Sequence, residues 1–205
     1  LGYMRSWDFN AIRLVDTENS TVENCNFIDK QTSERWILVA VLTFEKSNNC
    51  KAINNTFNRC TAIAISEGTA NIVNGNVMNN SPGTQIEVFV GTHHQVVNNT
   101  TNEQWYSVST IGSSAKYSTV SNNTINASSL SAVTMGHKNE VIGTDYGADY
   151  SIVENNHITG GVVATHSGRV GIFFKNGKGI KLINNTIHNL DKGTTHVNKE
   201  AAILF

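Results

Sequence analysis

A six-residue phrase recurs seven times along the chain and constrains its fold more than any other sequence feature. The phrase reads apolar, any, Asn, usually Asn, polar, apolar, and its clearest copy is LINNTI at residues 182–187. The other copies occupy residues 22–27, 52–57, 72–77, 96–101, 120–125 and 153–158. Their last residues lie 30, 20, 24, 24, 33 and 29 residues apart, a range typical of stacked supersecondary units.

Between these copies lies a second set of short segments, and several of them alternate apolar and polar residues as half-buried strands do. The segments are residues 11–15, 37–41, 62–65, 85–89, 106–109, 132–135, 171–174 and 201–204. Each period therefore contains three short strands, one from this set and two from the repeated phrase. A period this short, with this composition, leaves no room for a helix and predicts an all-β solenoid, the parallel β-helix.

The invariant Asn at the third position of the phrase is expected to form a ladder through the solenoid. Successive turns of such a coil stack about 4.8 Å apart, so identical amides can hydrogen-bond along the stack. Asn also tolerates the left-handed backbone of a sharp bend. The predicted ladder residues are Asn24, Asn54, Asn74, Asn98, Asn122, Asn155 and Asn184. The first and last residues of each copy are expected to point inward.

Length and charge limit the other possibilities. The 205 residues predict a single β-helix domain over 1–205, with 15% charged residues and a net charge of −1. No basic patch favours a nucleic-acid partner, and no apolar run approaches the roughly 18 residues of a membrane span. Because the first and last expected strands lie near the chain ends without polar caps, we expect the sequence to be an excerpt of a longer chain that self-associates when isolated.

The V-x-N-N-x-I repeat, its Asn ladder and the strands that end at Gly make the chain resemble the right-handed parallel β-helix family with the pectate-lyase-like fold. The resemblance implies a single-stranded coil of about seven to eight turns. The same fold is shared by polysaccharide lyases, glycoside hydrolases, epimerases, phage tailspikes and adhesins.

Two functional classes follow from this resemblance. The first is a carbohydrate-active module that binds, and as an enzyme would cleave, an extracellular acidic polysaccharide by lyase or hydrolase chemistry. The alternative is a non-catalytic structural shaft of a phage tailspike or surface adhesin, with a homotrimer as the candidate assembly. Both classes place the protein outside the cell, on a cell surface or on a virion.

The strands that end at Gly and the long loops beside them contain the candidate site residues, because loops on a rigid scaffold commonly carry function. Stacking should create a groove that binds substrate through outward side chains. The proposed groove residues are Arg13, Glu87, Ser107, Ser109, Thr134 and Phe173, with His137 in a neighbouring loop. His166, Arg169 and Lys175 form the candidate catalytic group, because a lyase needs a base and cations that neutralise a uronate carboxylate. The alternative is surface charge beside a loop.

The long loop 136–150 is the candidate metal site. Asp145 and Asp149, with Glu140 nearby, could hold Ca²⁺, a hard cation that takes oxygen ligands. The resemblance to the pectate-lyase-like family supports this, because lyases of that family often use such carboxylates to hold Ca²⁺ against a uronate. The alternative is that these residues belong to a solvated polar loop without a metal ion. The Asn-Thr-Asp and Asp-Asp motifs of polygalacturonases are absent, and Gly136-His137 matches only part of their Gly-His-Gly.

Overall fold

The structure is a computed structural model and describes residues 10–28, 40–81, 84–104, 111–126, 131–139, 144–160, 170–189 and 201–204. These residues form strands and turns without any helix, which confirms the predicted all-β class. No helix long and apolar enough to cross a membrane occurs in them.

Three parallel sheets run the length of the molecule. Sheet 1 contains β1 (Ile12–Val15), β4 (Leu42–Glu45), β7 (Ile63–Ser66), β10 (Ile86–Val88), β13 (Ile111–Ser113), β16 (Ser131–Met135), β21 (Val170–Phe174) and β24 (Ala201–Leu204). Sheet 2 contains β2 (Thr21–Glu23), β5 (Lys51–Ile53), β8 (Ile72–Asn74), β11 (Gln95–Val97), β14 (Thr119–Ser121), β19 (Ile152–Glu154) and β22 (Lys181–Ile183). Sheet 3 contains β3 (Asn26–Ile28), β6 (Thr56–Asn58), β9 (Val77–Ser81), β12 (Thr100–Gln104), β15 (Thr124–Asn126), β20 (His157–Thr159) and β23 (Thr186–His188).

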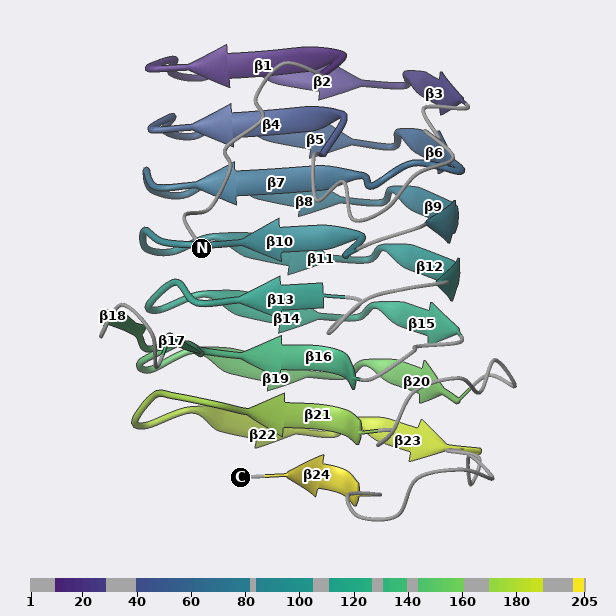
Figure 1. Ribbon diagram of the computed structural model, residues 1–205, viewed down its shortest axis with the longest axis vertical. Helices are drawn as coiled ribbons and strands as arrows, with labels where there is room; N and C mark the ends of the chain where they lie inside the picture. The colour runs from purple at the N-terminus through teal and green to yellow at the C-terminus, as the bar shows by residue number, and fades with distance from the viewer. Residues whose placement is uncertain are drawn as a thin grey trace.

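The chain visits the sheets in the order 1, 2, 3, and each visit adds one rung to a coil (Figure 1). Seen from the N-terminal rung, the chain runs clockwise as it moves away, so this is a right-handed parallel β-helix. The described residues form seven complete rungs and the sheet 1 strand of an eighth. A small antiparallel hairpin, β17 (His137–Asn139) and β18 (Thr144–Tyr146), leaves the coil after β16.

The corner between sheets 2 and 3 corrects the predicted ladder by one residue. Six of the seven third-position Asn residues have φ between 50° and 57°, as Asn122 does at 55°. They form the left-handed bend, and the side chain of Asn122 is exposed. The ladder is instead built by the Asn after the bend, which is the fourth residue of five copies and the fifth residue, Asn76, of the third copy. Its members are Asn55, Asn76, Asn99, Asn123, Asn156 and Asn185, and at the first rung the backbone N–H of Cys25 donates to Oδ1 of Asn55.

Asn123 shows how each ladder amide is used. Its Oδ1 accepts hydrogen bonds from the backbone N–H and the Nδ2 of Asn99, at 2.9 and 3.0 Å. Its Nδ2 donates to the Val96 carbonyl and to the Oδ1 of Asn156, both at 2.9 Å. The side chain is buried, so the ladder satisfies polar groups that water cannot reach.

The third copy of the phrase is shifted by one residue from the predicted frame. Val73 pairs with Ala52 and Met78 with Phe57, so Val73 and Met78 are the inward residues rather than Ile72 and Val77. Gly75 therefore occupies the bend, with φ of 67°; a Cβ there would lie 2.4 Å from Oδ1 of Asn54. Asn74, expected in the ladder, lies at the end of β8 instead.

Two sheet 1 strands also differ from the prediction. The strand of the second rung is Leu42–Glu45 rather than residues 37–41, because Leu42 and Phe44 pair with Ile12 and Leu14 and point into the core. The strand of the fifth rung is Ile111–Ser113, which pairs with both β10 and β16. Residues 106–109, predicted to be that strand, lie outside the described residues.

The core is a column of apolar side chains from all three sheets, including the stacked rings of Phe27 and Phe57 with centroids 4.8 Å apart. At the corner between sheets 1 and 2, buried polar side chains bridge neighbouring rungs. The backbone N–H of Asn71 donates to Nδ1 of His94 at 3.2 Å. Burial lowers the pKa of His94 from 6.5 to about 4, so this imidazole is a neutral structural acceptor.

The ladder assignment predicts opposite behaviour for two adjacent asparagines. Asn123→Ala leaves several buried polar groups without partners, and we expect it to lower the free energy of unfolding by about 2–3 kcal/mol. Asn122→Gly, which preserves the left-handed bend, should change it by less than about 1 kcal/mol. Denaturant unfolding of both variants tests this. Equal destabilisation by the two substitutions would contradict the assignment.

Candidate functional site

The candidate site lies on the outer face of sheet 1, where one register position of every strand from β1 to β21 points away from the core. This outer row is Arg13, Thr43, Ala64, Glu87, Gly112, Thr134 and Phe173. Parallel pairing thus brings Arg13, Glu87, Thr134 and Phe173, all predicted to line the groove, into one line. Arg13 and Phe173 each lie three strands from Glu87, or about 14 Å at ordinary strand spacing.

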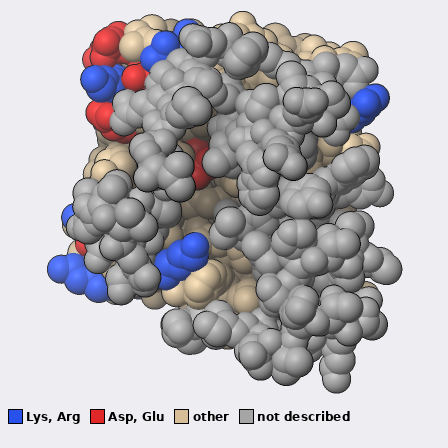
Figure 2. All heavy atoms as spheres, in the orientation of Figure 1, with Lys and Arg blue, Asp and Glu red and all other residues tan. Residues whose placement is uncertain are grey.

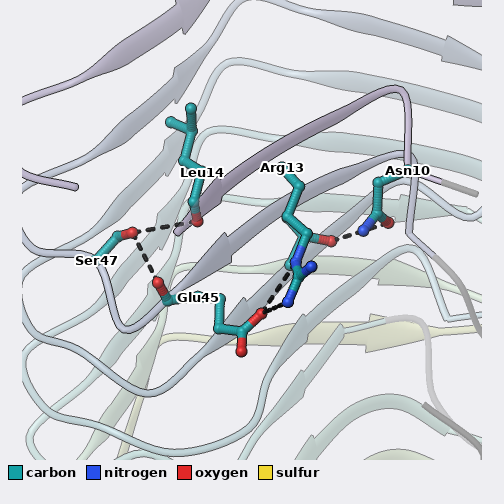
Figure 3. Close-up of polar contacts among 6 residues, drawn as sticks. Asn10, Arg13, Leu14, Glu45 and Ser47 are labelled. Atoms are coloured by element: carbon teal, nitrogen blue, oxygen red, sulfur yellow. Dashed lines mark hydrogen bonds and ion pairs between the residues drawn. The ribbon is translucent and has the colours of Figure 1, made fainter. Parts of the chain in front are cut away.

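At the N-terminal end of the outer row, Arg13 is engaged by an acidic residue of the next strand. Its Nε donates to Oε2 of Glu45 at 3.0 Å, and its Nη2 contacts the same oxygen. Figure 3 shows the two side chains directed toward each other across β1 and β4. The guanidinium would therefore meet a ligand as half of an ion pair.

At the centre of the outer row, Glu87 has no charged neighbour in the part of the chain that the structure describes. Its partners in register are Ala64 and Gly112, which offer it no polar side chain. No described residue forms an ion pair or side-chain hydrogen bond with it. Burial raises the pKa of Glu87 from 4.5 to about 7, because the charged form has lost water. A partly buried carboxyl without a polar partner costs stability and is characteristic of functional sites.

Near the C-terminal end of the outer row, Thr134 and Phe173 are paired on adjacent strands. The Nζ of Lys175 lies 5.5 Å from the ring centroid of Phe173, a cation–π contact. Phe173 and Lys175 therefore combine an aromatic face with a positive charge. Such a pair suits a sugar ring that carries a carboxylate.

The outer face of sheet 1 is not open along its whole length. Thr43 is 2% exposed and Thr134 is 6% exposed, although both point away from the core. Thr134 shares a 2.6 Å hydrogen bond with the Ser131 hydroxyl. Figure 2 shows this face, with acidic and basic side chains interspersed at the edge where β1 and β4 end.

His166, Arg169, Ser107 and Ser109 lie outside the described residues. The fifth-rung place expected for Ser107 and Ser109 in the outer row is taken by Gly112, because β13 is Ile111–Ser113. His137 starts the hairpin and pairs with Tyr146 through the backbone. The predicted long loop 136–150 therefore contains a regular hairpin.

The predicted Ca²⁺ ligands fall on and after the same hairpin. Asp145 pairs with Lys138 in the hairpin backbone. The carboxylate of Asp149 accepts from the backbone N–H of Lys178 at 3.0 Å and lies 3.5 Å from Nζ of Lys116. Among the described residues, no group of three or more His, Cys, Asp or Glu is placed to hold a metal ion. The Ca²⁺ site stays a prediction.

Two surface features were not anticipated from the sequence. The rings of His93, Tyr117 and Tyr150 stack at the corner between sheets 1 and 2, with centroids 5.2 and 5.4 Å apart. Beside this corner, toward the N-terminus, lies a hollow of about 250 Å³, lined by Asn19, Thr21, Asn49, Lys51, Ala70 and Ile72. Ring stacking between rungs follows from the register, so it can be read only once the strands are aligned.

Comparisons with protein-family models, curated proteins and solved structures found no match to this chain.

The isolation of Glu87 predicts a pH-dependent stability. Since its pKa is higher in the folded state, its contribution to stability decreases as the pH rises from 4.5 to about 7. Glu87→Gln removes this titration. We expect the variant to match the wild type below pH 4.5 and to exceed its free energy of unfolding by about 3 kcal/mol above pH 7.

The measurement is the difference between variant and wild type in denaturant unfolding across this pH range. The difference is needed because His94, with its lowered pKa, makes stability increase with pH and masks Glu87 in the wild type alone. Glu154→Gln, on the outer face of sheet 2, is the matched control. A difference that does not change with pH would show that Glu87 is ordinarily solvated.

Proposed function

We propose that the chain binds an extended acidic polysaccharide along the outer face of sheet 1, and that Glu87 transfers the proton in its cleavage. The observation that carries this proposal is the isolated carboxyl of Glu87 between Ala64 and Gly112. A structural role would pair or expose this group, whereas a proton-transfer group needs a pKa near the working pH. The pectate-lyase-like family is the one whose chemistry this site most resembles.

The arrangement of the outer row favours a long ligand over a small one. The Arg13–Glu45 pair, Glu87 and the Phe173–Lys175 pair follow one another at intervals of about 14 Å along the coil. A polysaccharide could contact all three, and Lys175 would attract its carboxylates. Close to an anionic sugar, the protonated form of Glu87 is favoured further, which suits a general acid.

A second candidate function, a non-catalytic shaft, is favoured by the outward amides of sheet 3. Asn58, Asn79, Asn102 and Asn126 form an outer ladder in which each Nδ2 donates to the preceding Oδ1 at 2.8–2.9 Å. The buried ladder at the corner between sheets 2 and 3, here called the inner ladder, and this outer ladder form two lines of amides along the coil. Hydrolysis by two carboxylates also requires a partner for Glu87, and its neighbours in the outer row supply none.

A screen of acidic and neutral polysaccharides separates the two candidates. Binding should weaken about three- to tenfold in Phe173→Ala, because the aromatic contact is lost. Cleavage should fall by about 10²–10⁴ in Glu87→Gln with binding largely retained. Glu154→Gln should resemble the wild type in both respects.

Two assays run together identify the reaction. Products that absorb as unsaturated uronates and also carry new reducing ends indicate elimination, whereas reducing ends alone indicate hydrolysis. If the chain bound none of the polysaccharides, the proposal would be overturned and the non-catalytic shaft would be the remaining candidate function. Binding that Phe173→Ala leaves unchanged, together with cleavage that Glu87→Gln leaves unchanged, would refute the placement on sheet 1.

A further inference from the structure

Two histidines converge on the outer face of sheet 3. His157 begins β20 and His188 ends β23, the neighbouring strand, so the two side chains lie diagonally across one strand pair. Their Nε2 atoms are 3.0 Å apart, with ring centroids 4.7 Å apart and planes inclined at 59°. Both side chains are exposed. The rings therefore approach through their nitrogen atoms rather than through their faces.

Two neutral imidazoles at this distance can share a single Nε2–H hydrogen. If both instead carry their hydrogens on Nδ1, both Nε2 lone pairs are available to one metal ion. Metal–imidazole bonds of about 2.0–2.1 Å whose nitrogen ends are 3.0 Å apart enclose an angle of roughly 90–100°. That angle is narrower than the tetrahedral angle of zinc sites and matches adjacent positions of a square-planar or octahedral ion.

We propose that His157 and His188 form a surface site for a tetragonal divalent ion, Cu²⁺ or Ni²⁺, that links the sixth and seventh rungs. The Thr159 hydroxyl lies 3.2 Å from Nε2 of His188, where it can contact a water on the ion, and solvent completes the coordination. Neither strand has a charged side chain, since β20 is His-Ile-Thr and β23 is Thr-Ile-His. An all-nitrogen site without a carboxylate disfavours Ca²⁺ and Mg²⁺.

The neighbouring rungs provide substitutions that keep the fold. The outward position of His157 is occupied by Thr in Thr100, Thr124 and Thr186. The outward position of His188 corresponds to the outer ladder of Asn58, Asn79, Asn102 and Asn126. His157→Thr and His188→Asn thus place residues that the coil already uses at these positions. We expect both variants to unfold as the wild type does without metal.

The test is a titration of the tag-free 205-residue chain with Cu²⁺, followed by electron paramagnetic resonance. We expect one ion coordinated by two imidazole nitrogens. Either substitution should weaken binding by about tenfold or more, because the chelate is lost. The double variant should bind little more weakly than either single one, since one remaining histidine no longer chelates. His93→Ala, an exposed histidine at another corner, is the control and should have no effect.

Stability gives a second readout. Because the ion binds across two rungs of the folded coil, saturating Cu²⁺ should raise the Tm of the wild type and of His93→Ala but not of the two site variants. A spectrum with one coordinating nitrogen, or affinity unchanged by His157→Thr and His188→Asn, would overturn the proposal. Equal and independent losses from the two substitutions would likewise show two separate imidazoles instead of a joint site.

Discussion

The inner ladder of amides is the interaction on which the rest of the coil depends. Asn123, for example, accepts from the backbone and side chain of Asn99 in the preceding rung, and donates to the Val96 carbonyl of that rung and to Asn156 in the next. Successive members lie between 21 and 33 residues apart, from Asn55–Asn76 to Asn123–Asn156. The ladder therefore fixes the register at one corner while extra residues are accommodated elsewhere, as the hairpin after β16 is. Sheet pairing and core alignment follow from this fixed corner.

Much of the fold could be predicted from the repeat, but the roles of its two Asn positions could not be separated by counting. Most copies have Asn at both positions, so either could be the ladder. The third copy resolves the ambiguity, since Gly75 has no side chain to hydrogen-bond and must occupy the bend, leaving Asn76 for the ladder. In the predicted frame 72–77, Asn74 takes the ladder position, and the role of Gly75 in the bend is hidden. Ile72 and Val73 are both apolar, and alternation alone does not say which one is buried.

The candidate site was less predictable because it depends on which residues become neighbours across rungs. Placing Glu87 on an outward position required only local alternation. Its isolation depends on Ala64 and Gly112, each more than 20 residues away and aligned only by the pairing of β7, β10 and β13. Choosing residues 106–109 as the fifth strand placed serines beside Glu87, where the structure has a glycine. The burial of Thr134, and the pKa of Glu87, are tertiary properties that alternation cannot supply.

Inner and outer positions of the coil carry different constraints, and this decides where new chemistry can arise. An inner amide such as Asn123 is shielded from water, so its loss leaves several buried polar groups without hydrogen-bond partners. The outer ladder from Asn58 to Asn126 forms equally short hydrogen bonds, but its side chains retain contact with water, which can replace a missing partner. The same outward line continues into Thr159 and His188 without interrupting strand pairing. Outward rows can thus exchange an amide for an imidazole without interrupting strand pairing, while the inner ladder holds such side chains at fixed intervals along the coil.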